Sequence, residues 1–136
     1  YRKTPASKKF GKTTPPAKIS SAMADLIEKY ELKKSVDLED ILDFHVKFER
    51  IRPYEDCNGR VGRLIMLKEC LRHGIIPFII DDKRRTGYLD GIRCWNDDPD
   101  VLMDVCIEAQ LRFEAQIVLQ GLLERQDRIQ RMTAKR

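Results

Sequence analysis

Apolar residues recur at every third or fourth position through most of this chain, and this spacing constrains the fold more than any other feature of the sequence. It places apolar side chains on one face of an α-helix, whereas a half-buried strand requires alternation at every second position. No stretch of useful length alternates in that way, and no internal repeat is visible. The sequence therefore predicts an all-α fold.

Five helices are predicted from the limits of the periodic stretches. They cover residues 17–30, 37–50, 58–74, 82–95 and a last segment from 99 to beyond 123. Asp37 is of a residue type that caps helix N-termini, and Gly74 suits the left-handed conformation that commonly follows a helix. Both residues support the limits drawn from the apolar pattern.

A chain of 136 residues is expected to form a single domain. We assign residues 1–123 to the core unit, in which a polar, proline-rich segment at 1–16 precedes the helical part at 17–123. The buried face of the last helix is predicted to consist of Leu102, Val105, Ala109, Phe113 and Ile117. Apolar residues thin out after this helix face, so residues 124–136 are expected to be a solvated or frayed extension.

Charge and hydropathy argue against two classes of partner. The net charge is +4, but residues 1–18 alone hold six cations and no carboxylate, which leaves the rest of the chain slightly acidic. A nucleic-acid-binding domain would carry its basic residues on the folded surface, so we expect no nucleic-acid partner. No apolar run approaches the roughly 20 residues of a membrane span, so we expect no membrane partner either.

The four cysteines form no C-x-x-C pair, and neither histidine has metal-ligand spacing to them. They are Cys57, Cys70, Cys94 and Cys106. The last three fall in helical patterns, where a small buried thiol is the simplest interpretation. These observations favour a reducing, cytoplasmic setting, which would be a host cytosol if the protein were secreted as an effector.

The stretch IRPYEDCNGRVGR, residues 51–63, combines backbone-bending residues with cations at the start of a helix. The first helical turn leaves amides without intrahelical acceptors, and the helix dipole places positive charge there, so anions are attracted to it. Arg60 and Arg63 share one helix face, and Asp56 offers a hard oxygen ligand for Mg²⁺. These residues leave two interpretations open, a phosphate-binding loop and an ordinary helix start with a solvated face.

The same stretch resembles the signature of the Fic (Fido) family, His-Pro-Phe-x-Asp/Glu-Gly-Asn-Gly-Arg-x-x-Arg. Six positions match it as they stand: Pro53, Asp56, Asn58, Gly59, Arg60 and Arg63. The flanking segments DFHVKFERI, LIMLKECLRHGIIPFII and RRTGYLDGI also resemble Fic helices, so the resemblance extends over about residues 1–120. It implies a compact helical bundle with a short N-terminal β-hairpin flap, and transfer of AMP from ATP to a hydroxyl side chain of a target protein.

The resemblance also implies roles for individual residues. Asp56 would hold Mg²⁺, and Tyr88 would lie near the adenine. The triphosphate of ATP would be gripped by Cys57, Asn58, Gly59, Arg60 and Arg63. Residues 1–12 would form the flap, on which the target protein docks as an added strand, although a disordered basic tail is an equal alternative from the sequence alone. A homo-oligomer is left open.

Three positions depart from the signature, and one of them alters the chemistry. Tyr54 replaces phenylalanine, which keeps the ring. Cys57 replaces the first glycine, which would strain a turn with positive φ, and its thiol is either reactive beside the arginines or an inert substitution. Arg52 stands where the family places its general-base histidine, and a guanidinium has no acceptor for a proton. His45 is expected to be a buried structural histidine rather than a substitute base.

Whether the chain is an enzyme therefore stays open. Loss of a positioned base lowers a rate by about 10²–10⁴-fold, so the first hypothesis is an AMP transferase impaired by Arg52. The second is a catalytically dead module that binds nucleotide or protein, in which Arg52 adds a phosphate contact. The third is a helical interaction module that has merely inherited the motif.

Overall fold

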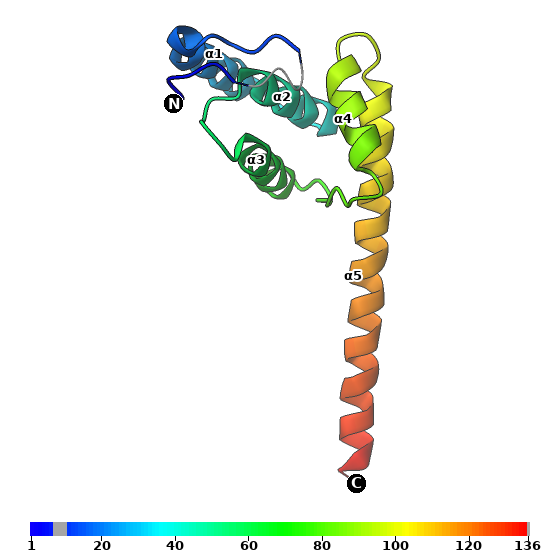
Figure 1. Cartoon of the computed structure of the whole chain (residues 1–136). Coiled ribbons are helices and arrows are strands. Elements are labelled where there is room, and N and C mark those ends of the chain that lie inside the picture. Colours follow the sequence, from blue (N-terminus) through cyan, green and yellow to red (C-terminus); the bar gives the residue numbers. More distant parts are fainter. Residues whose placement is uncertain (7–10, 136) are drawn as a thin grey trace.

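The structure is a computed structural model that describes residues 1–6 and 11–135. Within these residues the secondary structure is entirely helical, which confirms the predicted class. A 3₁₀ turn at Pro16–Lys18 leads into α1 (Ile19–Glu31), α2 (Leu38–Ile51), α3 (Asn58–Arg72), α4 (Arg85–Cys94) and α5 (Asp100–Ala134) (Figure 1). The order of the five predicted helices is confirmed, and their limits agree to within a few residues. Helix α5 extends beyond residue 123, as predicted.

Local signals set two of the helix ends. The Asp37 carboxylate accepts a hydrogen bond from the Asp40 amide at 2.9 Å, and the Asp40 carboxylate accepts one from the Asp37 amide at 3.1 Å. This reciprocal capping satisfies two amides that the first turn of α2 would otherwise leave without acceptors. Gly74 has a φ of 67° just beyond α3, which only glycine adopts without strain.

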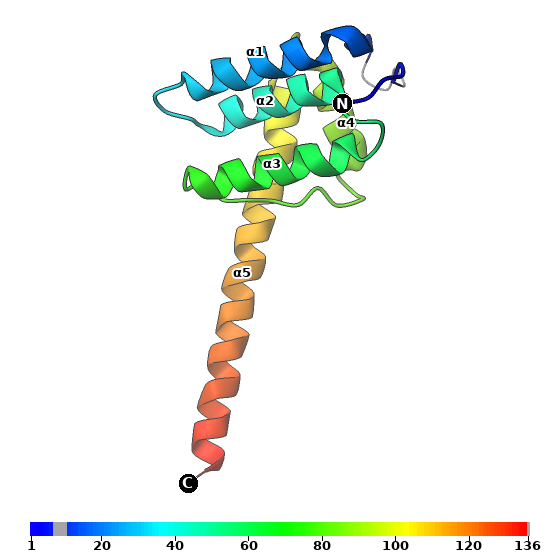
Figure 2. The same cartoon turned by 90° about the vertical axis from the view of Figure 1, so that its left-hand side faces the viewer.

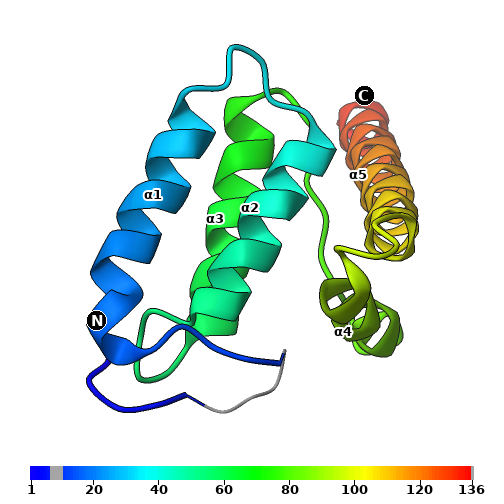
Figure 3. The ribbon, with the colours of Figure 1, turned by 90° about the horizontal axis from the view of Figure 1, so that it is seen from above.

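Helix α2 is the central element, because it is buried on two sides. The helices α1, α2 and α3 lie alongside one another, and α4 and α5 close the other side (Figure 3). The side of α2 that faces α1 contributes Phe44, Phe48 and Ile51, while its other side contributes Ile41, Leu42 and Val46 to a second cluster shared with α3, α4 and α5. Residues on both sides of α2 are therefore fixed by packing, including those next to its C-terminus.

Helix α5 projects well beyond the other helices (Figures 1 and 2). Leu102, Cys106 and Ala109 are buried in the core cluster that α5 shares with α2, α3 and α4, and Phe113 is half-buried. The prediction that Ile117 lies on the buried face is wrong, because no described element reaches that far along α5 and its side chain is 57% exposed. Apolar residues continue at helical spacing along α5 beyond the point where the core ends. In the part of the chain that the structure describes, no helix has both the length and the apolar character to cross a membrane.

The predicted β-hairpin flap is not seen. Residues 7–10 lie outside the described residues, and neither residues 1–6 nor 11–15 form a strand. The backbone of the first segment is bonded elsewhere: the Arg2 amide donates to the Pro53 carbonyl at 2.8 Å, and the Lys3 amide donates to the Glu55 carboxylate at 2.7 Å. The N-terminal segment is thus tied to the loop before α3, and these bonds replace those of a hairpin.

The contact between α4 and α5 generates a prediction about Gly91. An added Cβ would lie 2.8 Å from Leu102 Cα, so Gly91→Ala should lower the free energy of unfolding by about 1–3 kcal/mol, as expected for an overpacked contact. Gly87→Ala is the matched control in the same helix, because its Cβ would meet the Val105 Cγ2 methyl at 3.1 Å, and a side chain can give way. Urea unfolding measures both variants, and equal midpoints would contradict the prediction.

Candidate functional site

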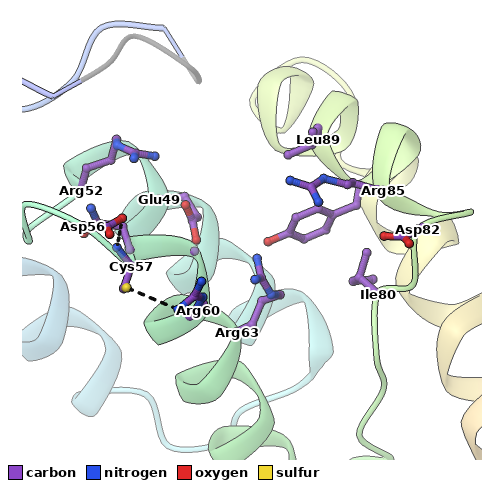
Figure 4. A pocket seen from close by; sticks show the side chains of 13 residues that line it. Glu49, Arg52, Asp56, Cys57, Arg60, Arg63, Ile80, Asp82, Arg85 and Leu89 are labelled. Carbon is purple, nitrogen blue, oxygen red and sulfur yellow. Dashed lines mark hydrogen bonds between the residues drawn. The ribbon is translucent and has the colours of Figure 1, made fainter.

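The residues proposed from the sequence converge on one pocket of about 260 Å³, where the loop of residues 52–57 (the motif loop) enters α3 (Figure 4). All eight line this pocket: Arg52, Asp56, Cys57, Asn58, Gly59, Arg60, Arg63 and Tyr88. The first seven come from the motif loop and the first two turns of α3, and Tyr88 comes from α4. The pocket therefore lies between the start of α3 and the face of α4.

Two residues of the motif loop have left-handed backbone conformations without being glycine. Arg52 has a φ of 49° and ends α2, and Cys57 has a φ of 62° and precedes α3. A side chain in this region of φ costs on the order of 1–3 kcal/mol, so the strain expected at Cys57 is present. Cys57, at the position of the first signature glycine, bends the backbone before α3. Gly59, at the position of the second signature glycine, lies inside α3 and has a helical backbone.

Asn58 holds the motif loop closed. Its side chain is buried, its Oδ1 accepts from the Tyr54 amide at 2.9 Å, and its Nδ2 donates to the Tyr54 carbonyl at 2.8 Å. These two bonds occupy the amide group on both sides. Asn58 thus determines the shape of the pocket by holding the motif loop, and its side-chain amide is occupied by the two hydrogen bonds to Tyr54.

Two glycines of α3 are required by close approach. A Cβ on Gly59 would lie 3.1 Å from Arg63 Nη1, so the absence of a side chain makes room for that guanidinium. A Cβ on Gly62 would lie 2.7 Å from Glu49 Oε1 and 3.1 Å from His45 Cε1. Gly62 therefore allows α3 to lie directly against the side chains of α2.

The pocket has a mixed and mainly cationic lining. Four arginines line it (Arg52, Arg60, Arg63 and Arg85), together with three carboxylates (Glu49, Asp56 and Asp82). Glu49, Asp82 and Arg85 were not predicted from the sequence. Glu49 lies one helical turn before Arg52 and Arg85 one turn before Tyr88, and residues three apart share a helix face, so this spacing was the signal that would have found both.

Arg2 is a further residue that was not predicted from the sequence, because it belongs to a run of basic residues that resembles a solvated tail. It is 3% exposed, and its Nε donates to the Arg52 carbonyl at 2.6 Å. The rest of its guanidinium donates to the Thr4, Thr14 and Ile51 carbonyls. Arg2 thereby satisfies carbonyls at the end of α2, where helical partners are lacking, and fixes the backbone of Arg52.

His45 is buried and hydrogen-bonded, as expected of a structural histidine. Its Nε2 lies 2.5 Å from the Tyr88 hydroxyl. Burial lowers the pKa of His45 to about 4, opposed by a backbone hydrogen bond to Gly62 and assisted by the Arg63 charge. Burial also raises the pKa of Tyr88, assisted by Glu49 and opposed by Arg63. The His45–Tyr88 pair thus joins α2 to α4 as neutral groups behind the pocket.

Asp56 is the residue suited to a magnesium ion. It is exposed at the pocket, and its Oδ1 accepts from the Cys57 amide at 2.6 Å. Among the described residues, no group of three or more histidine, cysteine or acidic side chains gathers as a metal cluster. Mg²⁺ is commonly held by one or two carboxylates together with phosphate oxygens and water, so the exposed Asp56 carboxylate beside the arginines of the pocket fits this ion.

The family model described as "Fic/DOC family" matches residues 1–70, which is half of the chain and contains the whole motif loop. This chain belongs to the Fic/DOC family. Two curated relatives, from Aedes aegypti and Culex quinquefasciatus, are each named "Protein adenylyltransferase Fic" and are 38% identical to it over 53 residues. The match takes in 39% of this Fic chain and 11% of each relative, so the relatives are far longer than the segment they share with it.

The buried His45 makes stability depend on pH. The folded pKa of about 4 lies below the ordinary value of 6.5, so between these pH values the unfolded chain binds a proton that the folded chain does not. Stability should therefore fall as the pH drops from 6.5 towards 4, with up to about 3 kcal/mol coming from His45. In His45→Gln this contribution is absent, and urea unfolding at a series of pH values should give a shallower decline. Parallel curves would contradict the prediction.

Proposed function

We propose that this Fic chain binds ATP with Mg²⁺ in the pocket at the start of α3, and that its chemistry is transfer of AMP to a hydroxyl of a target protein, impaired by Arg52. The observation that carries the proposal is the convergence of Arg52, Arg60 and Arg63 with the first amides of α3 on one pocket. Arginines present several donors to phosphate in a fixed geometry, and a helix N-terminus favours the same charge.

Each part of the pocket has a role in holding a triphosphate. Arg60 and Arg63 would hold the β- and γ-phosphates, while the amides of residues 58–60, which have no intrahelical acceptors, face the α- and β-phosphates. Asp56 would hold Mg²⁺, which neutralises phosphate charge when bound. The adenine would lie towards α4, where the Tyr88 ring and Leu89 form the wall of the pocket.

The transfer step requires a proton acceptor that Arg52 cannot supply. The target oxygen would form a bond to the α-phosphorus, the bond from that phosphorus to the bridging oxygen would break, and pyrophosphate would leave. The hydroxyl proton has to be taken up, and a guanidinium offers donors only. Arg52 instead suits a further contact to phosphate, which favours binding over turnover.

Because Arg52 favours phosphate binding over turnover, one alternative is supported, a nucleotide-binding module without turnover. The observation behind it is that Arg52 Nε is buried without a hydrogen-bond partner among the described residues, so a phosphate oxygen would supply the acceptor that it lacks. A helical interaction module is the weaker alternative, because it leaves the arginines in the pocket without a role.

We also propose that the target docks along residues 1–12, of which 7–10 lie outside the described residues. Residues 3–5 are exposed, and the segment is bonded to the motif loop through Arg2, Lys3 and Thr4. A target strand bound there by main-chain hydrogen bonds would lie at the edge of the pocket.

Nucleotide binding is tested with Arg60→Ala. Arg60 is exposed, and its Nη1 is 3.8 Å from Cys57 Sγ, so its loss should not disturb the fold. A hydrogen bond to a charged group contributes about 1.5–3 kcal/mol, so the affinity for Mg-ATP should fall by roughly tenfold or more. Arg72→Ala, in the last turn of the same helix, is the control and should bind as the wild type does. Calorimetry that detects no binding by the wild type would favour the interaction module.

Turnover is tested by restoring the signature. Arg52→His should increase transfer of label from α-³²P-ATP to the protein itself or to lysate proteins by at least about 10²-fold, the usual contribution of a general base. Combining it with Cys57→Gly should increase labelling further, since glycine relieves the strain of a φ of 62°. A double variant that binds ATP and labels nothing would refute AMP transfer and leave the binding module.

A further inference from the structure

The projecting half of α5 carries an apolar stripe that no described element covers. Five large apolar side chains of this stripe are each 53–63% exposed: Leu111, Val118, Leu122, Ile129 and Met132. An isolated helix gains little stability in water without an apolar face to bury. Burial of the stripe against a partner would therefore stabilise the projecting half of α5.

The stripe has heptad spacing. Starting at Leu111, steps of four and three residues lead through Ala115, Val118, Leu122, Arg125, Ile129 and Met132. Alternating steps of four and three are the signature of a coiled-coil seam, so we call these seven residues the seam. Only Arg125 interrupts its apolar character.

The seam faces away from the core of the same chain. Successive residues are about 100° apart around a helix, so Leu111 lies about 160° from Ala109, which is buried against the core. A second helix packed on the seam would therefore run along the outer side of α5. It would not collide with α4 or with the pocket.

We propose that the seam binds the seam of a second copy of this chain, with the two α5 helices antiparallel. The two-fold axis would pass near Gln120, so that seam residues whose numbers add up to 240 face each other, while flanking residues on the same side of the seam face each other where their numbers add up to 242. Leu122 then faces Val118 of the second copy, and Ile129 faces Leu111 of the second copy. The contact would extend over residues 111–129 of each chain, about 27 Å at the rise of an α-helix.

The same pairing accounts for the one polar residue in the seam. Arg125 faces Ala115 of the second copy, so the longest seam side chain meets the smallest one. Arginine can lay its methylene stem across an apolar surface while its charged end reaches water. A large side chain at position 115 would exclude this arrangement.

Charges beside the seam select the antiparallel direction. Glu114 and Arg128 flank the seam on the same side, each one residue before a seam residue (Ala115 and Ile129), and an antiparallel coiled coil brings such flanking positions of the two helices together. Glu114 of each chain then lies opposite Arg128 of the other, which gives two symmetric ion pairs. In a parallel pair Glu114 would instead lie beside Leu119 of the second copy, and Arg128 would gain no carboxylate. Within the described residues neither Glu114 nor Arg128 forms a salt bridge.

The pairing is tested by the mass of the full chain in solution. At about 100 µM, where even micromolar pairing is nearly complete, light scattering should give twice the monomer mass of 15.9 kDa. Leu122→Glu places a charge in the seam and should return the mass to that of the monomer. Leu123→Glu is the matched control, because Leu123 is also exposed, at 48%, but lies off the seam. A monomeric wild type, or equal loss of mass in both variants, would overturn the proposal.

The direction of pairing is tested by exchanging the charges. Glu114→Arg and Arg128→Glu should each shift the equilibrium towards monomer, since each creates two like-charge pairs. The double variant restores opposite charges across the interface and should recover the wild-type mass. Both sites are exposed, so the fold should be unaffected, which circular dichroism checks. A double variant no more dimeric than the single variants would overturn the antiparallel arrangement.

Discussion

The close approach of α3 to α2 at Gly62 is the constraint on which the rest of the site depends. Since a Cβ there would lie 2.7 Å from Glu49 Oε1, the start of α3 is held against the end of α2, and both helices are fixed by their shares of the core. The chain then has only residues 52–57 in which to leave one helix and enter the next. So tight a reversal explains why both ends of this loop adopt left-handed conformations, even though neither residue is a glycine.

A strained loop persists only where its surroundings hold it in place, and here two side chains do so from opposite directions. Asn58 bonds the backbone of Tyr54 from within the loop, while Arg2 bonds the carbonyls of Ile51 and Arg52 from the N-terminal segment. The strain is thus offset by hydrogen bonds from Asn58 and Arg2. The groups that point into the pocket, chiefly guanidiniums, are left to meet a ligand.

The helices and the core of the site could be predicted from the sequence, because both depend on local information. Apolar spacing predicted the five helices, a contiguous motif predicted seven residues that line one pocket, and the wider resemblance added Tyr88. What could not be predicted depends on contacts between distant segments. Arg2 looked like part of a solvated basic tail, since nothing near it in the sequence shows that it reaches the end of α2. Ile117 was predicted to be buried because the helical period of apolar residues continues beyond the end of the core. The flap was predicted to be a hairpin because nothing near it in the sequence shows that Arg2 and Lys3 are hydrogen-bonded to Pro53 and Glu55, about 50 residues away.

The position of Arg2 has a practical consequence for work on this protein. Loss of the Arg2 side chain would remove the guanidinium that binds the end of α2 and expose backbone carbonyls beside the pocket. The site is therefore not confined to the contiguous signature, and a variant made for any ligand assay needs Arg2 and its hydrogen bonds intact.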